Sequence, residues 1–256
     1  AAGINYNLNL FDTVHEECPN LPIFAAECCA TGTTRDWHVE SDESNGRIRD
    51  YDTTPFTAWY SSRKDTRKHY MERPYVFGAF QWISVDHRGE AMWPAISSKS
   101  GAIDMFLQKK AAFYLNKSYW TDEPLVHIVP HWNFNGLEDQ KIFVPVYTNC
   151  DELELFLNGK SLGKKQIEKY SWGEWCVPFE KGELLCVGYK NGTRVCDVGT
   201  DHAYLPIYLK QSGIAQSVIA TDLNEKPILN AQKNIKDSRA CACIYAYFRR
   251  GCIRKR

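Results

Sequence analysis

The sequence predicts a chain of class α/β plus all-β, in which a parallel sheet, a small β-sandwich and one βαβ unit follow one another. Residues 1–120 hold continuous apolar runs and a segment of helical period at 105–120, a pattern typical of a buried parallel sheet with helices. Residues 124–190 hold short strand candidates separated by turn sequences, which favours a sandwich. Residues 193–236 have the order strand, glycine turn, helix, strand, helix, which predicts a βαβ unit. Residues 237–256 have no usable periodicity and stay unassigned.

Composition sets loose bounds on the function. The chain has 256 residues, 44% of them hydrophobic, and its 31 basic and 31 acidic residues give no net charge. A neutral chain has no general attraction to nucleic acid or anionic lipid, and no apolar run approaches the roughly 20 residues of a membrane helix. We therefore expect no membrane partner. The chain starts without Met or a leader, which we interpret as a truncation, and its compartment and oligomeric state stay open.

Two apolar runs in the first stretch lead to acidic residues. Residues 21–26 end on Glu27, and residues 75–82 run towards Asp86, with Glu90 shortly beyond. In barrel enzymes the carboxyl ends of buried parallel strands carry the catalytic groups. These carboxylates are therefore candidates for chemistry, although a single Glu after an apolar run is more often a solvated strand end.

The second stretch alternates strands and turns. Asn158-Gly159, flanked by Glu-Leu-Phe-Leu and Lys-Ser-Leu, predicts a tight hairpin. The strand candidates are residues 125–129, 141–147, 152–157, 175–179 and 183–189.

The tail repeats the order of a nucleotide-binding unit. Residues 195–199 and 217–222 are the expected strands, and residues 204–211 and 227–235 are the expected helices.

Cysteines and histidines give no metal pattern. The ten cysteines include Cys28–Cys29 and Cys241–Cys243, which lack the two-residue gap of zinc and redox motifs, so we interpret them as mostly buried free thiols. His127 and His131 have a spacing that suits a metal on a helix, but Pro130 and the strand-like run before it argue against a helix there. We predict no metal site.

Motifs in the first 192 residues follow the order of a known enzyme family. They are Gly3-Ile-Asn-Tyr-Asn7, Pro22-Ile-Phe-Ala-Ala-Glu27, Thr34-Arg35, Tyr51-Asp52, Phe80-Gln-Trp-Ile-Ser-Val-Asp86, Ser100-Gly-Ala-Ile-Asp104, His127-Ile-Val-Pro-His-Trp132 and Thr148-Asn-Cys-Asp-Glu-Leu-Glu-Leu-Phe-Leu-Asn-Gly-Lys-Ser-Leu-Gly163. In these motifs the chain resembles the family 2 glycoside hydrolases of the β-galactosidase type.

This resemblance implies a fold and a set of roles. Residues 1–120 would be the last strands and helices of a (β/α) barrel, and residues 124–190 an immunoglobulin-like sandwich. By position in its motif, Glu27 matches the catalytic nucleophile. Tyr6 matches the tyrosine that hydrogen-bonds the nucleophile, and Trp82 matches the aromatic wall of the sugar subsite.

The implied activity is that of a retaining hydrolase of β-galactosides or related β-glycosides, with a carbohydrate substrate and no cofactor. The family's acid/base Glu would lie before Ala1, so we expect the chain alone to be inactive. The sequence also departs from common family patterns at Gly78-Ala79-Phe80, at Trp82-Ile-Ser-Val-Asp86 and at Thr34-Arg35-Asp36.

The tail carries a second resemblance. Cys196-Asp-Val-Gly-Thr-Asp-His-Ala-Tyr-Leu-Pro-Ile-Tyr-Leu209 and Ile219-Ala-Thr-Asp-Leu-Asn-Glu-Lys-Pro227 are similar to the start of a bacterial tRNA adenine-N1 methyltransferase. Such enzymes bind S-adenosylmethionine on a Rossmann-like sheet. The resemblance matches Asp197 and Gly199 to the cofactor turn and Asp222 to the acid that binds the ribose, and the spacing fits nucleotide-binding sheets.

The leading interpretation is a glycosidase fragment joined to a methyltransferase fragment near residues 191–195, by gene fusion, frameshift or assembly error. The alternatives are a tRNA methyltransferase fragment, which would take S-adenosylmethionine as cofactor, and a non-catalytic sugar-binding module built on the sandwich. Apart from the terminal arginines the chain has no obvious basic patch for tRNA. We therefore expect no nucleic-acid partner under the leading interpretation.

Overall fold

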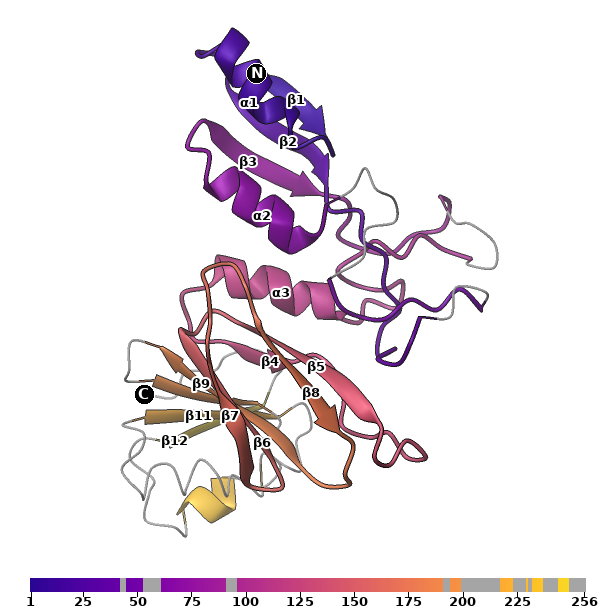
Figure 1. Cartoon of the computed structure of the whole chain (residues 1–256), viewed down its shortest axis with the longest axis vertical. Coiled ribbons are helices and arrows are strands. Elements are labelled where there is room, and N and C mark those ends of the chain that lie inside the picture. Colours follow the sequence, from indigo (N-terminus) through magenta and orange to yellow (C-terminus); the bar gives the residue numbers. More distant parts are fainter. Residues whose placement is uncertain are drawn as a thin grey trace. The chain divides into compact units, whose positions relative to one another are not determined.

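The computed structural model of the chain describes residues 1–41, 45–52, 61–90, 96–190, 194–198, 217–222, 229, 232–236 and 244–248. These residues form two compact units (Figure 1). The first unit is Ala1–Lys117 with Val129–His131, and the second is Ser118–Ile128 with Trp132–Arg256. No helix in the described part of the chain is long and apolar enough to cross a membrane.

The first unit contains a three-stranded parallel sheet with two connecting helices. Along the chain the elements are β1 (Ala2–Asn5), α1 (Leu10–Glu17), β2 (Ile23–Cys28), α2 (Arg63–Met71) and β3 (Val76–Gln81). The strands lie in the order β1-β2-β3, and both neighbouring pairs are parallel. Parallel neighbours need a crossover, and here each crossover contains a helix. The predicted parallel sheet is confirmed.

The two faces of this sheet differ. One face packs against the helices through a buried apolar cluster. The opposite face carries Phe24, whose ring contacts the rings of Phe77 and Phe80. The cluster consists of Ile4, Phe11, Ile23, Ala25, Cys28, Cys29 and Val76. Helix α2 begins at Ser62, whose hydroxyl accepts a hydrogen bond from the Asp65 amide, as expected of a serine N-cap.

The helix predicted over residues 105–120 begins later, as α3 at Ala111–Trp120. The Asp104 carboxylate accepts hydrogen bonds from the backbone amides of Phe106 (2.9 Å) and Gln108 (2.8 Å), which closes a turn, and Leu107 has a left-handed φ of 60°. A side chain that binds nearby amides in this way competes with the helix. The prediction was therefore wrong for residues 105–110, where Phe106 and Leu107 are exposed.

The second unit contains two antiparallel layers. Strands β4 (Val126–Ile128), β5 (Lys141–Thr148) and β8 (Gly173–Pro178) form one sheet in the order β4-β5-β8. In the other sheet, β6 (Glu152–Leu157) pairs with both β7 (Lys160–Gln166) and β9 (Leu184–Lys190). Burial alternates residue by residue along β6 and β8, the pattern of strands with one face in a core.

The predicted hairpin joins β6 and β7. Asn158 (φ 49°) and Gly159 (φ 76°) both take left-handed backbone conformations, which a two-residue turn of this type requires. The turn chemistry of the sequence therefore predicted this connection correctly.

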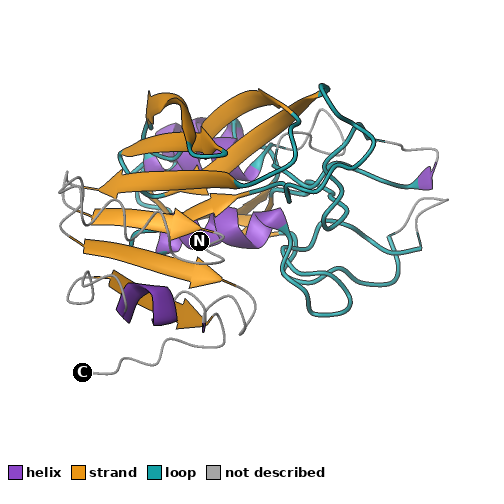
Figure 2. Cartoon of the chain, turned by 90° about the horizontal axis from the view of Figure 1, so that it is seen from below, coloured by secondary structure: helices purple, strands orange, loops and turns teal. Residues whose placement is uncertain are grey.

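The tail extends the sheet of β6, β7 and β9 through backbone pairing of three further strands. Strand β10 (Arg194–Val198) pairs antiparallel with β9 and parallel with β11 (Ser217–Asp222), and β12 (Ile244–Phe248) adds a third parallel strand. The sheet thus runs β12-β11-β10-β9-β6-β7. Strands of the chain, drawn in orange, lie side by side in Figure 2.

Sequence predictions for the tail have mixed outcomes. The strands expected at 195–199 and 217–222 are present as β10 and β11. Residue 229 and residues 232–235 of the expected second helix are helical. The helix expected at 204–211 lies outside the described residues. The unassigned tail contains a strand that sequence analysis missed, because five consecutive apolar residues show no alternation.

Candidate functional site

The predicted site residues meet at the carboxyl edge of the parallel sheet. Tyr6 follows β1, Glu27 is the penultimate residue of β2, and Trp82 follows β3. The Tyr6 amide donates to the Glu27 carbonyl (2.8 Å), and the Trp82 amide donates to the Cys28 carbonyl (2.7 Å). The backbone therefore holds all three residues next to the end of β2, where barrel enzymes place their chemistry.

A register shift determines where Glu27 points. Ile4 is opposite Ala25, but the next residue, Asn5, is opposite Glu27, so one residue of β2 is left over. Ala25 and Cys28 are both buried in the cluster under the helices. Side chains alternate along a strand, so Glu27, next to Cys28, points to the face away from the helices. Bulges of this kind are common beside active sites, where they redirect a side chain.

The chain turns sharply at the same edge. Tyr6 (φ 58°) and Cys29 (φ 65°) take left-handed conformations, which are uncommon for residues other than glycine, and the Trp82–Ile83 peptide is cis. Trp82 is half-buried, and its ring meets the His87 ring edge to face at 6.0 Å. Left-handed residues held in this way cluster at functional sites, which supports this edge as the candidate site.

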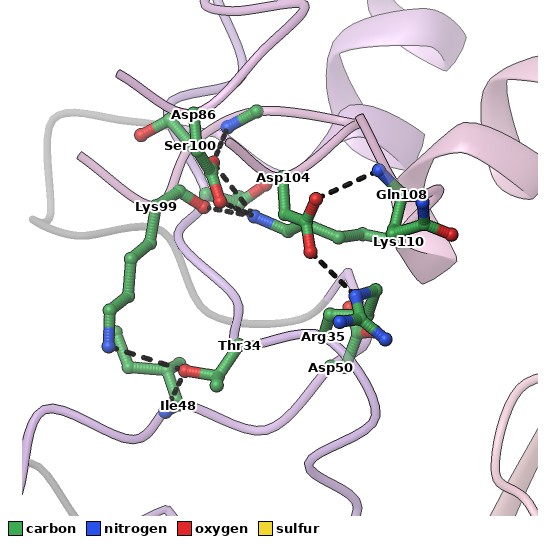
Figure 3. Close-up of polar contacts among 12 residues, drawn as sticks. Thr34, Arg35, Ile48, Asp50, Asp86, Lys99, Ser100, Asp104, Gln108 and Lys110 are labelled. Carbon is green, nitrogen blue, oxygen red and sulfur yellow. Dashed lines mark hydrogen bonds and ion pairs between the residues drawn. The ribbon is translucent and has the colours of Figure 1, made fainter. Parts of the chain in front are cut away.

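Asp86 and Glu90, the two carboxylate candidates beyond β3, have different environments. Asp86 belongs to a buried ion pair. The Lys110 ammonium lies 3.0 and 3.1 Å from the Asp86 carboxylate oxygens and also donates to the Lys99 carbonyl (2.7 Å) (Figure 3). The Gly101 amide donates to Asp86 as well (2.7 Å). Burial raises the pKa of Asp86 and lowers the pKa of Lys110, and their mutual attraction opposes both shifts. Glu90, in contrast, is exposed.

A second buried pair supports the loop after β2. The Arg63 guanidinium is fully buried and donates to the Thr31 hydroxyl and to the Ser100 carbonyl (2.8 Å). The Asp52 carboxylate accepts hydrogen bonds from the Thr31 hydroxyl (3.2 Å) and the Arg63 amide (3.0 Å), and it lies 3.6 Å from the guanidinium. A buried charge needs such partners, so these residues fix the loops around the site.

Asp50 is buried within the same loops. Its carboxylate accepts hydrogen bonds from the amides of Asp36 (3.1 Å) and Ala111 (3.3 Å), and burial raises its pKa to about 6. Arg35 and Asp104 form a further ion pair at 2.6 Å (Figure 3). The motif residues Thr34-Arg35, Asp52, Asp86 and Asp104 thus contribute to the structure of these loops. Sequence analysis missed the partners Arg63 and Lys110, because nothing in their local sequence indicates burial.

His127 and His131 do not lie on a helix. His127 lies in β4, and the His131 ring contacts the His38 ring at 5.2 Å. Burial lowers the pKa of His38 to about 3, so it is neutral at physiological pH. Among the described residues, no group of three or more His, Cys, Asp or Glu side chains could hold a metal ion.

Two family profiles match parts of the chain. One, described as "Domain of unknown function (DUF4982)", matches residues 139–196, and the other, described as "Methyltransferase domain", matches residues 185–252. The matches overlap in β9 and the first half of β10.

The chain is similar to β-glycosidases over more than half of its length. A putative β-glucuronidase of Formosa agariphila is 37% identical over 162 residues, which is 59% of this chain and 16% of the relative. The β-galactosidase BoGH2A of Bacteroides ovatus is 32% identical over 143 residues, which is 54% of this chain and 17% of the relative. The chain thus spans about a sixth of the length of these curated relatives.

Solved structures define the same class. A β-glycosidase from Bacteroides vulgatus is 29% identical with a TM-score of 0.60, over 71% of this chain and 27% of that one. A glycosyl hydrolase family 2 member from Bacteroides cellulosilyticus is 28% identical with a TM-score of 0.55, over 74% of this chain and 24% of that one. The homologues and structural neighbours are therefore family 2 β-glycosidases, named as β-glucuronidases and β-galactosidases.

Proposed function

We propose that this chain is the carboxyl-terminal part of a retaining family 2 β-glycosidase, comprising the last strands of its (β/α) barrel and its immunoglobulin-like sandwich. The observation that carries the proposal is the position of Glu27. It lies at the carboxyl end of a parallel strand, on the face away from the helices. The backbone amides of Tyr6 and Trp82 donate hydrogen bonds to the carbonyls of Glu27 and Cys28 beside it.

Each of the three residues has a role in this mechanism. The Glu27 carboxylate attacks the anomeric carbon of a β-galactoside or related β-glycoside and forms a covalent glycosyl ester, which water then hydrolyses. The Tyr6 hydroxyl donates a hydrogen bond that orients the carboxylate, and the Trp82 ring lies against an apolar face of the sugar. Leaving-group protonation needs a second carboxylic acid, which the family supplies from an earlier barrel strand.

A chimaeric enzyme tests these roles. Residues 1–190 would replace the matching segment of the Bacteroides vulgatus β-glycosidase, and hydrolysis of nitrophenyl β-galactoside and nitrophenyl β-glucuronide would be measured. We expect turnover of one of them, with a loss of at least about 10³-fold in Glu27→Gln. Glu16→Gln, at an ordinary exposed glutamate of α1, is the matched control. A folded Glu27→Gln chimaera with an unchanged rate contradicts the proposal.

The tail supports a second candidate function, S-adenosylmethionine-dependent methyl transfer to tRNA. The observation in its favour is the parallel order β10-β11-β12, together with the methyltransferase profile. Asp197 lies in β10 and Asp222 ends β11, but Gly199, which would form the cofactor turn, lies outside the described residues. Asp197 and Asp222 thus lie near the carboxyl ends of two parallel strands, where a nucleotide-binding sheet carries its acidic residues. We propose that a methyltransferase fragment is fused to the glycosidase fragment near residues 191–195.

A further inference from the structure

Two cations in the loops of the first unit have no acidic partner within the described part of the chain. Arg35, Arg63 and Lys110 each pair with an aspartate in these loops. Lys99 and Arg47, in contrast, form no ion pair with any residue that the structure describes. Neighbouring positive charges without counterions attract anions, so these two side chains are candidates for a binding site.

The half-buried Lys99 side chain extends to Thr34 (Figure 3). Its ammonium lies 3.4 Å from the Thr34 hydroxyl oxygen, which is longer than an ordinary hydrogen bond of this kind. Burial lowers the pKa of Lys99, attraction to Asp86 opposes this shift, and repulsion by Arg47 adds to it. Asp86 is already held by Lys110. An anion bound here would give the Lys99 ammonium a charged hydrogen-bond partner, which is a strong interaction in a partly desolvated position.

Backbone pairing brings Arg47 close to the same hydroxyl. The amide of the next residue, Ile48, donates to the Thr34 hydroxyl (3.0 Å), and the Thr34 amide donates to the Ile48 carbonyl (2.8 Å). The exposed Arg47 guanidinium lies over the Trp37 ring, 4.7 Å from its centroid. The Trp37 amide donates to the Thr34 carbonyl (3.1 Å), so this ring belongs to the same turn. Stacking on an aromatic face orders a guanidinium and leaves its N–H donors available to a ligand.

The Thr34 hydroxyl supplies a third donor. Its oxygen accepts hydrogen bonds from the Ile48 amide and the Lys99 ammonium, which occupy its two lone pairs. No acceptor for its hydrogen is found among the described residues. A hydroxyl hydrogen, an ammonium and a guanidinium, from three separate segments of the chain, are therefore all available to a group that only accepts hydrogen bonds.

We propose that Thr34, Arg47 and Lys99 form a binding site for a tetrahedral oxoanion, either free sulfate or phosphate or the same group as an ester on a glycan. The Lys99 ammonium supplies a point charge, the Arg47 fork binds two oxygens, and the Thr34 hydroxyl donates to a third. Donors from three segments suit the divergent oxygens of a tetrahedral anion better than the two coplanar oxygens of a carboxylate. None of the three residues has a role in the proposed hydrolysis, so the site goes beyond it.

Titration calorimetry of the full 256-residue chain with sodium sulfate tests the site. Sodium chloride holds the ionic strength constant, because salt screens such attraction. We expect saturable binding of one sulfate and an affinity loss of about 10–100-fold in Lys99→Met, the range that a hydrogen bond to a charged group contributes. Arg47→Met changes an exposed side chain, so it should weaken binding without disturbing the fold, and Lys99→Arg should retain most of the affinity. The matched control is Lys68→Met, at an exposed lysine of α2.

A second titration, with galactose 6-sulfate, identifies the source of the anion. Affinity at least about tenfold higher than for inorganic sulfate assigns the site to a glycan ester, and affinity no higher assigns it to the free ion; the site stands in both cases. Sulfate binding that persists in both Lys99→Met and Arg47→Met, or that falls equally in Lys68→Met, overturns the site. So does a folded, unchanged chain that binds no sulfate. Glu27→Gln should bind sulfate as the unchanged chain does, so a failure of the proposed hydrolysis leaves this result unaffected.

Discussion

Replacing Lys110 by Met should lower the free energy of unfolding of the first unit far more than a surface substitution does. The Lys110 side chain is completely buried, and its partner Asp86 is 9% exposed. The substitution keeps the length and apolar stem of the side chain and removes the ammonium. Asp86 is then left as a buried carboxylate with only the Gly101 amide as a donor in the described contacts.

The expected cost follows from this geometry. Removing one partner of a buried ion pair typically costs about 3–5 kcal/mol, because the remaining charge is desolvated and uncompensated. With a urea slope of about 2 kcal/mol per molar, the unfolding midpoint should fall by about 1.5–2.5 M. Lys110→Met/Asp86→Asn should recover most of this loss, because the amide oxygen still accepts from the Gly101 amide and no buried charge remains.

The assay is pulsed thiol labelling in urea with peptide mass spectrometry. Cys28 and Cys29 are buried in the first unit and report its unfolding, while the buried Cys150 and Cys186 report the second unit. Lys109→Met, at the exposed neighbouring position, is the matched control and should cost less than about 1 kcal/mol. If Lys110→Met and Lys109→Met shift the Cys28 midpoint equally, the ion pair does not have the structural role argued for it.

Four further predictions concern activity, domain limits, pH and the tail. The chain alone should not hydrolyse nitrophenyl β-galactoside at an enzymatic rate, because lost leaving-group protonation is commonly worth 10²–10⁴-fold; turnover that disappears in Glu27→Gln would refute this. Limited proteolysis should leave a protected core near residues 124–190, and a surviving core within residues 1–110 would contradict the domain assignment. Burial raises the pKa of Asp50 to about 6 from 3.8, so its contribution to stability is present below about pH 4 and is lost as pH rises through about 6. The urea midpoint of the unchanged chain should therefore fall between pH 4 and pH 7, and this part of its pH dependence should be absent in Asp50→Asn. Calorimetric titration with S-adenosylmethionine should show no binding, whereas micromolar affinity abolished by Asp222→Ala would favour the methyltransferase interpretation.

Patterns that depend on neighbouring residues were predictable from the sequence. The apolar runs before Glu27 and Trp82 identified two strands of the parallel sheet, because continuous apolar runs of this length are typical of such strands. The Asn158-Gly159 pair identified its hairpin, because few residues accept two successive left-handed conformations. The three site residues were placed at one edge by family resemblance, and the backbone hydrogen bonds at Glu27 bring them together there.

Features that depend on distant pairing were not predictable. The direction of Glu27 depends on a register shift against β1, and nothing in the local sequence marks the extra residue. Lys110 is buried because Asp86 lies 3.0 Å away, and a lysine beside Lys109 otherwise looks like a solvated surface residue. The residues of the Asp104 turn follow the apolar period of a helix, so a helix was predicted there. The period does not show that the Asp104 carboxylate binds the backbone amides of the turn instead.

The mixed sheet of the second unit gives a physical account of the proposed fusion. Strand β10 pairs antiparallel with β9 and parallel with β11, which lies within the part of the chain that the methyltransferase profile matches. Both family matches include the start of this strand. A strand at a sheet edge offers its free backbone groups to whichever strand follows, and mixed sheets commonly combine antiparallel and parallel neighbours. Under the proposed fusion, a segment that begins with a strand can therefore continue the sheet of β6, β7 and β9 through backbone hydrogen bonds.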